Sequence, residues 1–202
     1  MTADPASRPA RERLLAAAAE LFYGAGIAAT GVDAVLRRAG VSPATMYAHF
    51  AGKDALVAAY LEQRHAGWRQ TWDDVLAEQT DPAERLLSVF DAVDRYRSRQ
   101  GNGRGCGFLA AAIELPATHP GQRWLEADSR LLLDRLRTLA VEAGATDPDD
   151  VADTLLLLYD GALNRLARTA TTPDLPADDP LDHARRLAAE WVTQTLRAPS
   201  GS

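Results

Sequence analysis

Seven side chains between residues 42 and 53 are of types that contact nucleic acid. Thr45 can offer a hydroxyl to a base edge, and the methyl groups of Ala44 and Thr45 can meet a thymine. Tyr47, His49 and Lys53 can contact phosphate oxygens. The candidate set is Ser42, Pro43, Ala44, Thr45, Tyr47, His49 and Lys53.

Two short helices joined by a tight turn would position this set. We expect Thr30 and Asp33 to form a capping box at the start of the first helix, and Gly40 to end it. Ser42 and Pro43 suit the cap and first position of the second helix. A glycine in the turn allows the steep angle of a helix-turn-helix unit, whose second helix enters the major groove. The same spacing also fits a plain helical hairpin with a buried Tyr-x-x-Phe pair.

The chain of 202 residues is acidic, with a net charge of −6, but its charge is unevenly distributed. Residues 1–54 hold six basic and five acidic groups, whereas residues 55–202 hold sixteen basic and twenty-three acidic groups. An acidic chain is poorly suited to unspecific attraction to nucleic acid or to an anionic membrane. Any nucleic-acid surface is therefore expected near the N-terminus.

Apolar residues recur at helical spacing along almost the whole chain, and no alternating strand pattern is evident. The expected fold is all-α with about nine helices. A three-helix domain over residues 1–52 is expected to precede a larger helical domain over residues 53–202. Besides the two short helices, the expected helices span about 8–23, 52–79, 82–100, 106–115, 120–143, 149–170 and 180–197, with glycine and proline near their ends.

Residues 30–56, TGVDAVLRRAGVSPATMYAHFAGKDAL, resemble the DNA-binding signature of the TetR/AcrR family of bacterial repressors. The stretch from Gly105 to Pro116 also resembles a G-C-x-F-x-x-A-A-x-E segment of some members. Gly31 stands where the family usually has Ser or Thr, and Ala44 replaces a frequent glycine, so individual DNA contacts differ. The matching positions are Thr30, Val32, Val35, Ala39, Gly40, Val41, Ser42, Thr45, Tyr47, His49, Phe50, Lys53, Asp54 and Leu56.

This resemblance implies a homodimeric transcriptional regulator that binds a double-stranded DNA operator with an inverted repeat. It adds Thr30 and Gly31 to the expected DNA-contacting residues. It also implies a larger domain whose helices enclose a ligand cavity and form a four-helix dimer interface.

Aromatic side chains recur on the inward faces of the later helices, and Trp68 and Trp72 are one helical turn apart. Such a series usually forms core. Around a cavity it would bind a small, largely apolar effector, which a few polar groups would orient. The candidate ligand-binding residues are Trp68, Trp72, Phe90, Phe108, Glu114, Trp124, Tyr159 and Asn164.

The last two helices carry more apolar surface than one domain can cover. The leucine run at residues 155–158 spreads over more than half of a helix circumference, and a helix that is apolar all round has to be buried on two sides. The final helix adds an apolar stripe that includes Leu187 and Trp191. A homodimer formed through residues 151–170 and 180–197 would cover both surfaces.

Other chemistries find little support in the sequence. Cys106 is the single cysteine; it suits a small apolar residue at a helix start, and a redox sensor is the alternative. The glycine-rich loop at residues 101–107 lacks the Lys-Ser/Thr pair of a phosphate-binding loop. No catalytic constellation stands out and the four histidines are scattered, so no enzyme activity, metal or other cofactor is expected. With neither a membrane-spanning run nor a signal peptide, the expected location is cytoplasmic.

The sequence therefore predicts a ligand-responsive, DNA-binding transcriptional regulator, a repressor that a small apolar effector releases from its operator. The first alternative is a helical effector-binding protein or Cys106-based redox sensor that does not bind DNA. The second is a small helical enzyme.

Overall fold

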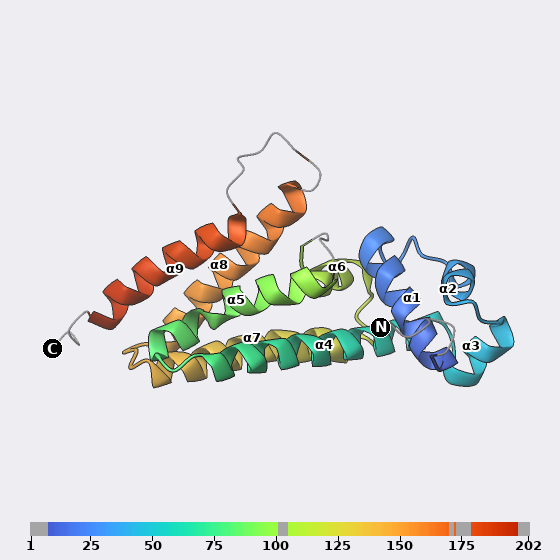
Figure 1. Ribbon diagram of the computed structural model, residues 1–202, viewed down its shortest axis with the longest axis horizontal. Coiled ribbons are helices and arrows are strands. Elements are labelled where there is room, and N and C mark those ends of the chain that lie inside the picture. The colour runs from blue at the N-terminus through green and yellow to red at the C-terminus, as the bar shows by residue number, and fades with distance from the viewer. Residues whose placement is uncertain (1–7, 101–104, 170–171, 173–178, 198–202) are drawn as a thin grey trace. The chain divides into compact units, whose positions relative to one another are not determined.

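Nine α-helices and no β-strand make up the part of the chain that the computed structural model describes, residues 8–100, 105–169, 172 and 179–197 (Figure 1). The all-α prediction is confirmed, and the seven longer spans given above lie within two residues of the observed bounds. The helices are α1 (Ala10–Ala25), α2 (Val32–Ala39), α3 (Pro43–His49), α4 (Lys53–Glu78), α5 (Pro82–Gln100), α6 (Gly107–Glu114), α7 (Gln122–Glu142), α8 (Pro148–Thr169) and α9 (Pro180–Arg197).

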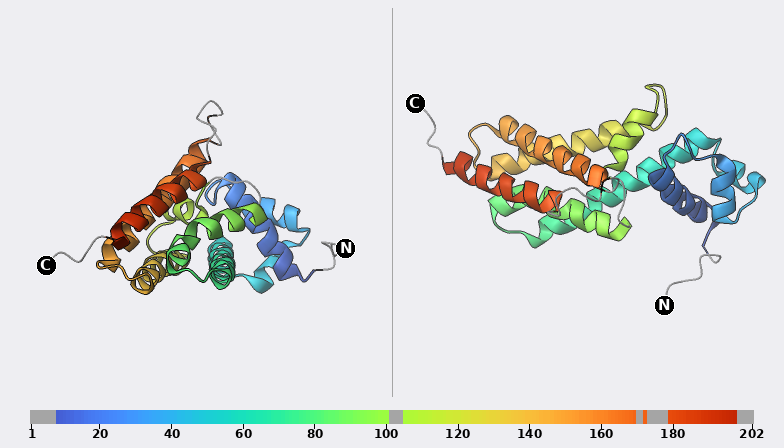
Figure 2. Two further views of the ribbon diagram at one scale, coloured as in Figure 1. Left: turned by 60° about the vertical axis from the view of Figure 1, so that its left-hand side comes forward. Right: turned by 90° about the horizontal axis from the view of Figure 1, so that it is seen from above.

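The chain forms two compact units, and Figure 2 gives two further views of their helices. Unit 1 consists of Met1–His65 and Gly107–Ala127, and unit 2 of Ala66–Cys106 and Asp128–Ser202. Helices α4 and α7 each contribute to both units. This division differs from the predicted domain boundary after residue 52, because α6 belongs to unit 1. The functional roles expected for residues 1–52 and 53–202 stay predictions.

In unit 1, α1 packs against α2 and α3 through apolar faces. Leu14 and Phe22 of α1, Val35 of α2 and Met46 of α3 are buried. Helix α1 continues through the expected stop at Gly24 and ends at Ala25, where Gly26 takes a positive φ of 97°. The apolar face of α1 is thus the surface that holds the three helices together.

Two glycine positions and one buried threonine define the ends of α2. Gly40 adopts the left-handed conformation and closes the helix: its N–H donates to Arg37 O, and the Val41 N–H donates to Leu36 O. The prediction that Thr30 caps α2 is wrong, because Gly31 occupies the cap position without a side-chain hydrogen bond. Thr30 is buried instead, and its hydroxyl donates to Gly26 O at 2.6 Å.

Unit 2 is built around one hydrophobic core to which α4, α5, α7, α8 and α9 contribute. Helix α9 packs against both α5 and α8. Asp81 caps α5, since its carboxylate accepts the N–H groups of Ala83 and Glu84. Among the described residues, no helix is long and apolar enough to cross a membrane.

Candidate nucleic-acid interface and regulatory core

The turn between α2 and α3 places the N-terminal end of α3 at the surface of unit 1. Ser42 caps α3, with its hydroxyl oxygen accepting the Thr45 N–H at 3.2 Å, and Pro43 is the first helical residue, as predicted. The hydroxyls of Ser42 and Thr45 lie 2.8 Å apart. The cap therefore also fixes the Thr45 side chain, which is the candidate for base contact.

Helix α3 has one buried and one exposed face. Met46 is buried in unit 1, whereas Ser42, Pro43 and Ala44 are exposed. Tyr47 is 58% exposed, which is unusual for a large aromatic residue. The hairpin interpretation with a buried Tyr-x-x-Phe pair is therefore wrong for Tyr47, although Phe50 is buried.

The remaining candidates for DNA contact lie at both ends of this surface. His49 is exposed at the last position of α3, and Lys53 begins α4 and is half-buried. Gly31 is exposed, and a Cβ added there would have no atom within 4 Å. Thr30 is different, because its buried hydroxyl already donates to the backbone. As DNA contacts, all these residues stay predictions.

Four of the eight candidate ligand-binding residues lie together in unit 2. They belong to an aromatic cluster, defined here as Trp68, Trp72, Phe90, Tyr96 and Tyr159, all of which are buried. The ring centroids of Trp68 lie 5.4 Å from Trp72, 5.9 Å from Tyr96 and 6.4 Å from Tyr159. Tyr96, on α5, is a member that the sequence interpretation missed.

The aromatic cluster holds polar partners at its edge. The Trp72 indole N–H donates to Ser88 Oγ at 2.9 Å, and Ser88 is fully buried. The Arg135 guanidinium lies 4.8 Å from the Trp72 ring and forms an ion pair with Asp73. Since a cation over an indole face is attracted by the ring, Arg135 fixes the position of Trp72 from α7. No spacing in the sequence indicated Ser88 or Arg135.

The other candidate ligand residues have contacts outside this cluster. Phe108 and Trp124 flank the His65 ring in unit 1, with centroid distances of 6.4 and 5.8 Å. The Glu114 carboxylate accepts the Ala28 N–H at 2.6 Å. Asn164 is exposed on α8 and donates to Asp160 O in its own helix. Phe108, Glu114 and Trp124 thus belong to unit 1 and the other five candidates to unit 2, and the ligand contacts of all eight stay predictions.

Glu114 links α6 to the turn that precedes α2. A Cβ added at Gly26 would lie 3.1 Å from the Glu114 carboxylate, so the glycine leaves room for this approach. The Arg64 guanidinium of α4 lies 4.6 Å from the Tyr23 ring of α1 and 5.8 Å from the Phe108 ring of α6. The buried His119 side chain lies 3.5 Å from the Asp54 carboxylate near the start of α4. These contacts join α6 and the α6–α7 loop to helices of the helix-turn-helix region within unit 1.

Cys106 precedes α6 and packs, partly buried, against the core of unit 2. This placement agrees with its interpretation as a small apolar residue at a helix start. The glycine-rich loop at residues 101–107 lies mostly outside the described residues.

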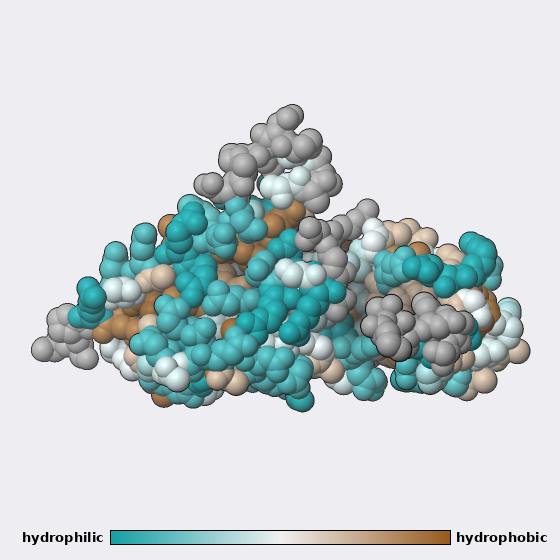
Figure 3. Space-filling view, in the orientation of Figure 1, coloured by the Kyte–Doolittle hydropathy of each residue, from teal (hydrophilic) through white to brown (hydrophobic). Residues whose placement is uncertain are grey.

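Helices α8 and α9 expose part of their apolar surface. Leu155 is fully buried, but Leu157 is 74% exposed and Leu187 is 42% exposed. Trp191 is half-buried. Brown, apolar surface lies along these helices on the face drawn in Figure 3. The prediction that one unit cannot cover both helices is consistent with these exposures.

The comparisons with known proteins agree with this architecture. Residues 14–60 match the family "Bacterial regulatory proteins, tetR family". A TetR-family transcriptional regulator from Streptomyces coelicolor is 30% identical, with a TM-score of 0.77, over 93% of this chain and 94% of that one. A putative TetR transcriptional regulator from Streptomyces avermitilis is 36% identical, with a TM-score of 0.69, over 90% and 98%.

A curated relative covers a shorter stretch. The transcriptional activator FasR of Mycolicibacterium smegmatis is 40% identical over 98 residues, 46% of this chain and 42% of FasR. The chain thus matches less than half the length of this relative. The family match and these related regulators identify a transcriptional regulator with a DNA-binding helix-turn-helix, which corresponds to α2 and α3 of the structure. The chain belongs to the TetR family of transcriptional regulators, and these relatives are regulators rather than enzymes.

Proposed function

We propose that this regulator is a homodimeric repressor that binds an inverted-repeat DNA operator through α3 and leaves it when a small, largely apolar effector binds. The observation that carries the proposal is the exposed face of α3, where Tyr47 is 58% exposed beside the ordered Ser42–Thr45 pair. Such a surface suits a partner outside the protein. A cytoplasmic location is part of the proposal, because the operator lies there.

The roles of the α3 side chains follow from their chemistry. Thr45 and Ala44 are short enough to approach base edges in the major groove, where a hydroxyl and a methyl group distinguish base pairs. Tyr47, His49 and Lys53 reach outward to phosphates. A gel-shift assay with the DNA that flanks the regulator's own gene tests this interaction; absence of a specific complex would refute it.

The dimer is proposed on the apolar surface of α8 and α9. A second copy of these helices would cover Leu157, Leu187 and Trp191 through a two-fold axis. The two recognition helices would then contact half-sites about one helical turn apart, or a multiple of it. Trp191→Glu should give monomers with weak operator binding, whereas a wild-type monomer at micromolar concentration in light scattering would contradict the dimer.

The effector is proposed to act at the aromatic residues of unit 2 and α6. Trp68 and Trp72 lie in α4, which continues into unit 1, and Glu114 of α6 holds the backbone just before α2. A ligand that moves either helix would alter the position of the helix-turn-helix. It releases DNA only if it binds the DNA-incompetent arrangement more tightly.

Tryptophan fluorescence gives a direct screen for the effector. An inducer should change the indole signal and dissociate the operator complex over the same concentration range. Trp68→Phe should weaken its binding, while Trp72→Phe replaces the indole with a smaller aromatic ring and removes the hydrogen bond to Ser88. If both variants bind the inducer as tightly as the wild type, the effector site lies elsewhere.

The redox alternative has its own control. Cys106→Ser keeps the size of the side chain but removes the thiol chemistry. Under the proposal this variant binds operator and responds to the effector as the wild type does. Loss of the response in Cys106→Ser would favour the sensor instead.

A further inference from the structure

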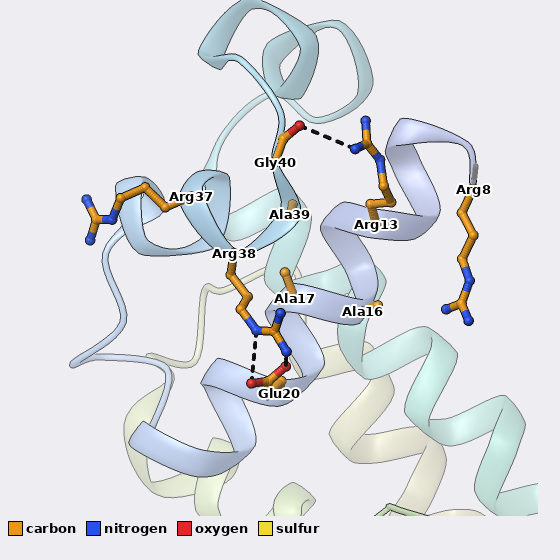
Figure 4. A pocket seen from close by; sticks show the side chains of 9 residues that line it. All are labelled: Arg8, Arg13, Ala16, Ala17, Glu20, Arg37, Arg38, Ala39 and Gly40. Carbon is orange, nitrogen blue, oxygen red and sulfur yellow. Dashed lines mark hydrogen bonds and ion pairs between the residues drawn. The ribbon is translucent and has the colours of Figure 1, made fainter. Parts of the chain in front are cut away.

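A groove between α1 and α2 carries most of the positive charge of unit 1's N-terminal region. It measures about 430 Å³ and lies beside the turn that leads into α3 (Figure 4). We call it the arginine groove. Its lining residues are Arg8, Arg13, Ala16, Ala17, Glu20, Arg37, Arg38, Ala39 and Gly40.

The groove supplies positive charge that α3 lacks. A protein of net charge −6 has to approach a polyanion, yet α3 contains no Lys or Arg, and Lys53 is the single such residue between Val41 and Ala55. Phosphate neutralisation supplies much of the affinity of DNA-binding proteins, so the cations have to come from elsewhere. Four of the six basic residues in positions 1–54 line this groove.

The arginines differ in how much of their charge is free for an anion. Arg38 is committed, because its guanidinium lies 2.6 Å from the Glu20 carboxylate, whose hydrogen bond and charge raise the pKa of Arg38. Arg8 and Arg37 are exposed, and in Figure 4 no interaction joins either to another residue drawn. Both can therefore accept an external partner.

Arg13 ties the groove to the DNA-reading helix. Its Nη1 donates to Gly40 O at 3.3 Å, at the turn before Ser42, while its Nε is buried without a hydrogen-bond partner. Ala16, Ala17 and Ala39 contribute small side chains to the lining, and the Glu20–Arg38 ion pair lies beside Ala17 between α1 and α2 (Figure 4). Guanidinium groups bind phosphate oxygens with two parallel hydrogen bonds, which suits such an open site.

We propose that the arginine groove binds the sugar–phosphate backbone of the operator next to the half-site that α3 contacts, an inference that rests on the proposed function. Arg8 and Arg37 contact the phosphates directly, and Arg13 holds the groove against the turn. A free phosphate would satisfy the same guanidinium groups, but the absence of cations in α3 favours the backbone of DNA as the occupant.

The salt dependence of operator binding measures these contacts. Each phosphate that a dimer no longer neutralises lowers the slope of log K against log salt concentration by about 0.9. The double variant Arg8→Gln, Arg37→Gln should therefore reduce the slope by about 2 to 4 per dimer, because each protomer loses one or two contacts. It should weaken operator and mismatched DNA by the same factor, on the order of tenfold or more.

Two variants serve as controls. Arg69→Gln removes one positive charge, half of what the double variant removes, from the exposed surface of α4 in unit 2 and should leave the slope unchanged. Glu20→Gln releases Arg38 from its ion pair, and should tighten DNA binding and steepen the slope. Circular dichroism of each variant checks that it is folded.

The outcomes separate this inference from the proposed function. If the wild type binds no specific DNA, the proposed function fails. If the wild type binds but Arg8→Gln, Arg37→Gln keeps its slope and affinity, the proposed function stands and the arginine groove is not a DNA contact. The inference would also be overturned in favour of a free anion by a different result. In that result, millimolar inorganic phosphate stabilises the wild type against thermal unfolding, and the double variant loses this stabilisation without any change in DNA binding.

Discussion

The outer face of α3 and the aromatic cluster of unit 2 both carry large aromatic side chains, but the protein holds them in opposite ways. Tyr47 is 58% exposed, whereas Trp72 is fully buried and donates its indole N–H to Ser88. The first arrangement leaves side-chain surface for a partner outside the chain. The second satisfies the side chain within the chain, so any effector has to compete with packing that already exists.

The two regions also differ in what positions them. Helix α3 is placed by neighbours in sequence, with the left-handed Gly40 ending α2 and the Ser42 hydroxyl capping α3. The aromatic cluster depends on contacts between α4, α5 and α8, as the Trp68–Tyr96 and Trp68–Tyr159 pairs show. A change in α3 should therefore affect binding more than stability, and a change in the cluster should do the reverse.

The largest expected effect is on stability, from truncation of Trp72. Trp72→Ala should lower the free energy of unfolding by about 3–5 kcal/mol, because it leaves a cavity and strands the Ser88 hydroxyl. Tyr47→Ala removes a similar ring from an exposed site and should change it by less than about 0.5 kcal/mol. Chemical denaturation of both variants measures the difference. Equal losses in the free energy of unfolding would contradict the proposed difference between the two regions.

A smaller effect is expected in DNA recognition from Thr45. If this hydroxyl contacts a base, Thr45→Ala should relax the preference at one or two base pairs by about 1–3 kcal/mol. Thr45→Ser keeps the hydroxyl beside Ser42 and separates its role from that of the methyl group. Competition binding with operators mutated one position at a time provides the measurement, and an unchanged preference profile in Thr45→Ala would remove this residue from the interface.

Loss of the α3 cap should cost about 1 kcal/mol of stability. Ser42→Ala leaves the Thr45 N–H without its side-chain acceptor. Ser42→Asp restores an acceptor but adds a negative charge near DNA, so it should recover stability while weakening operator binding. Thermal unfolding and gel shifts on the same samples test both parts, and a stable, tightly binding Ser42→Ala would show that the cap is not needed.

The smallest expected effect comes from Gly31. A Cβ fits there without contact, and Ser at this cap position should stabilise α2 by a few tenths of a kcal/mol. Its hydroxyl would also face solvent where the TetR signature usually has Ser or Thr. Gly31→Ser should therefore bind operator more tightly than the wild type, and Gly31→Ala, which lacks the hydroxyl, should not.

Sequence patterns predicted the elements that depend on short-range chemistry. Gly40 and the Ser42-Pro43 pair act at helix ends as expected. The capping role of Thr30 failed, because the carbonyl of Gly26 in the folded turn competes for its hydroxyl. Residue preferences at helix caps do not take into account that a buried turn offers the Thr30 hydroxyl another acceptor.

The surroundings of the candidate ligand-binding residues were harder to predict, since helical spacing gives the face of a residue but not its neighbour. The ligand contact of Glu114 stays a prediction, but no pattern indicated that its carboxylate accepts the backbone N–H of Ala28, far away in sequence. The arginine groove could not be predicted for the same reason: arginines of α1 and α2 line one groove only because α1 packs on α2. Neither pairing leaves a signal in local composition.

Selection of binding sites from random DNA tests the central claim, that the exposed face of α3 reads an operator. The wild type should enrich an inverted repeat with half-sites about one helical turn apart or a multiple of it. Tyr47→Ala, Lys53→Ala should remain folded and enrich nothing above background. Enrichment of the same repeat by the folded double variant, or of no repeat by the wild type, would contradict the claim.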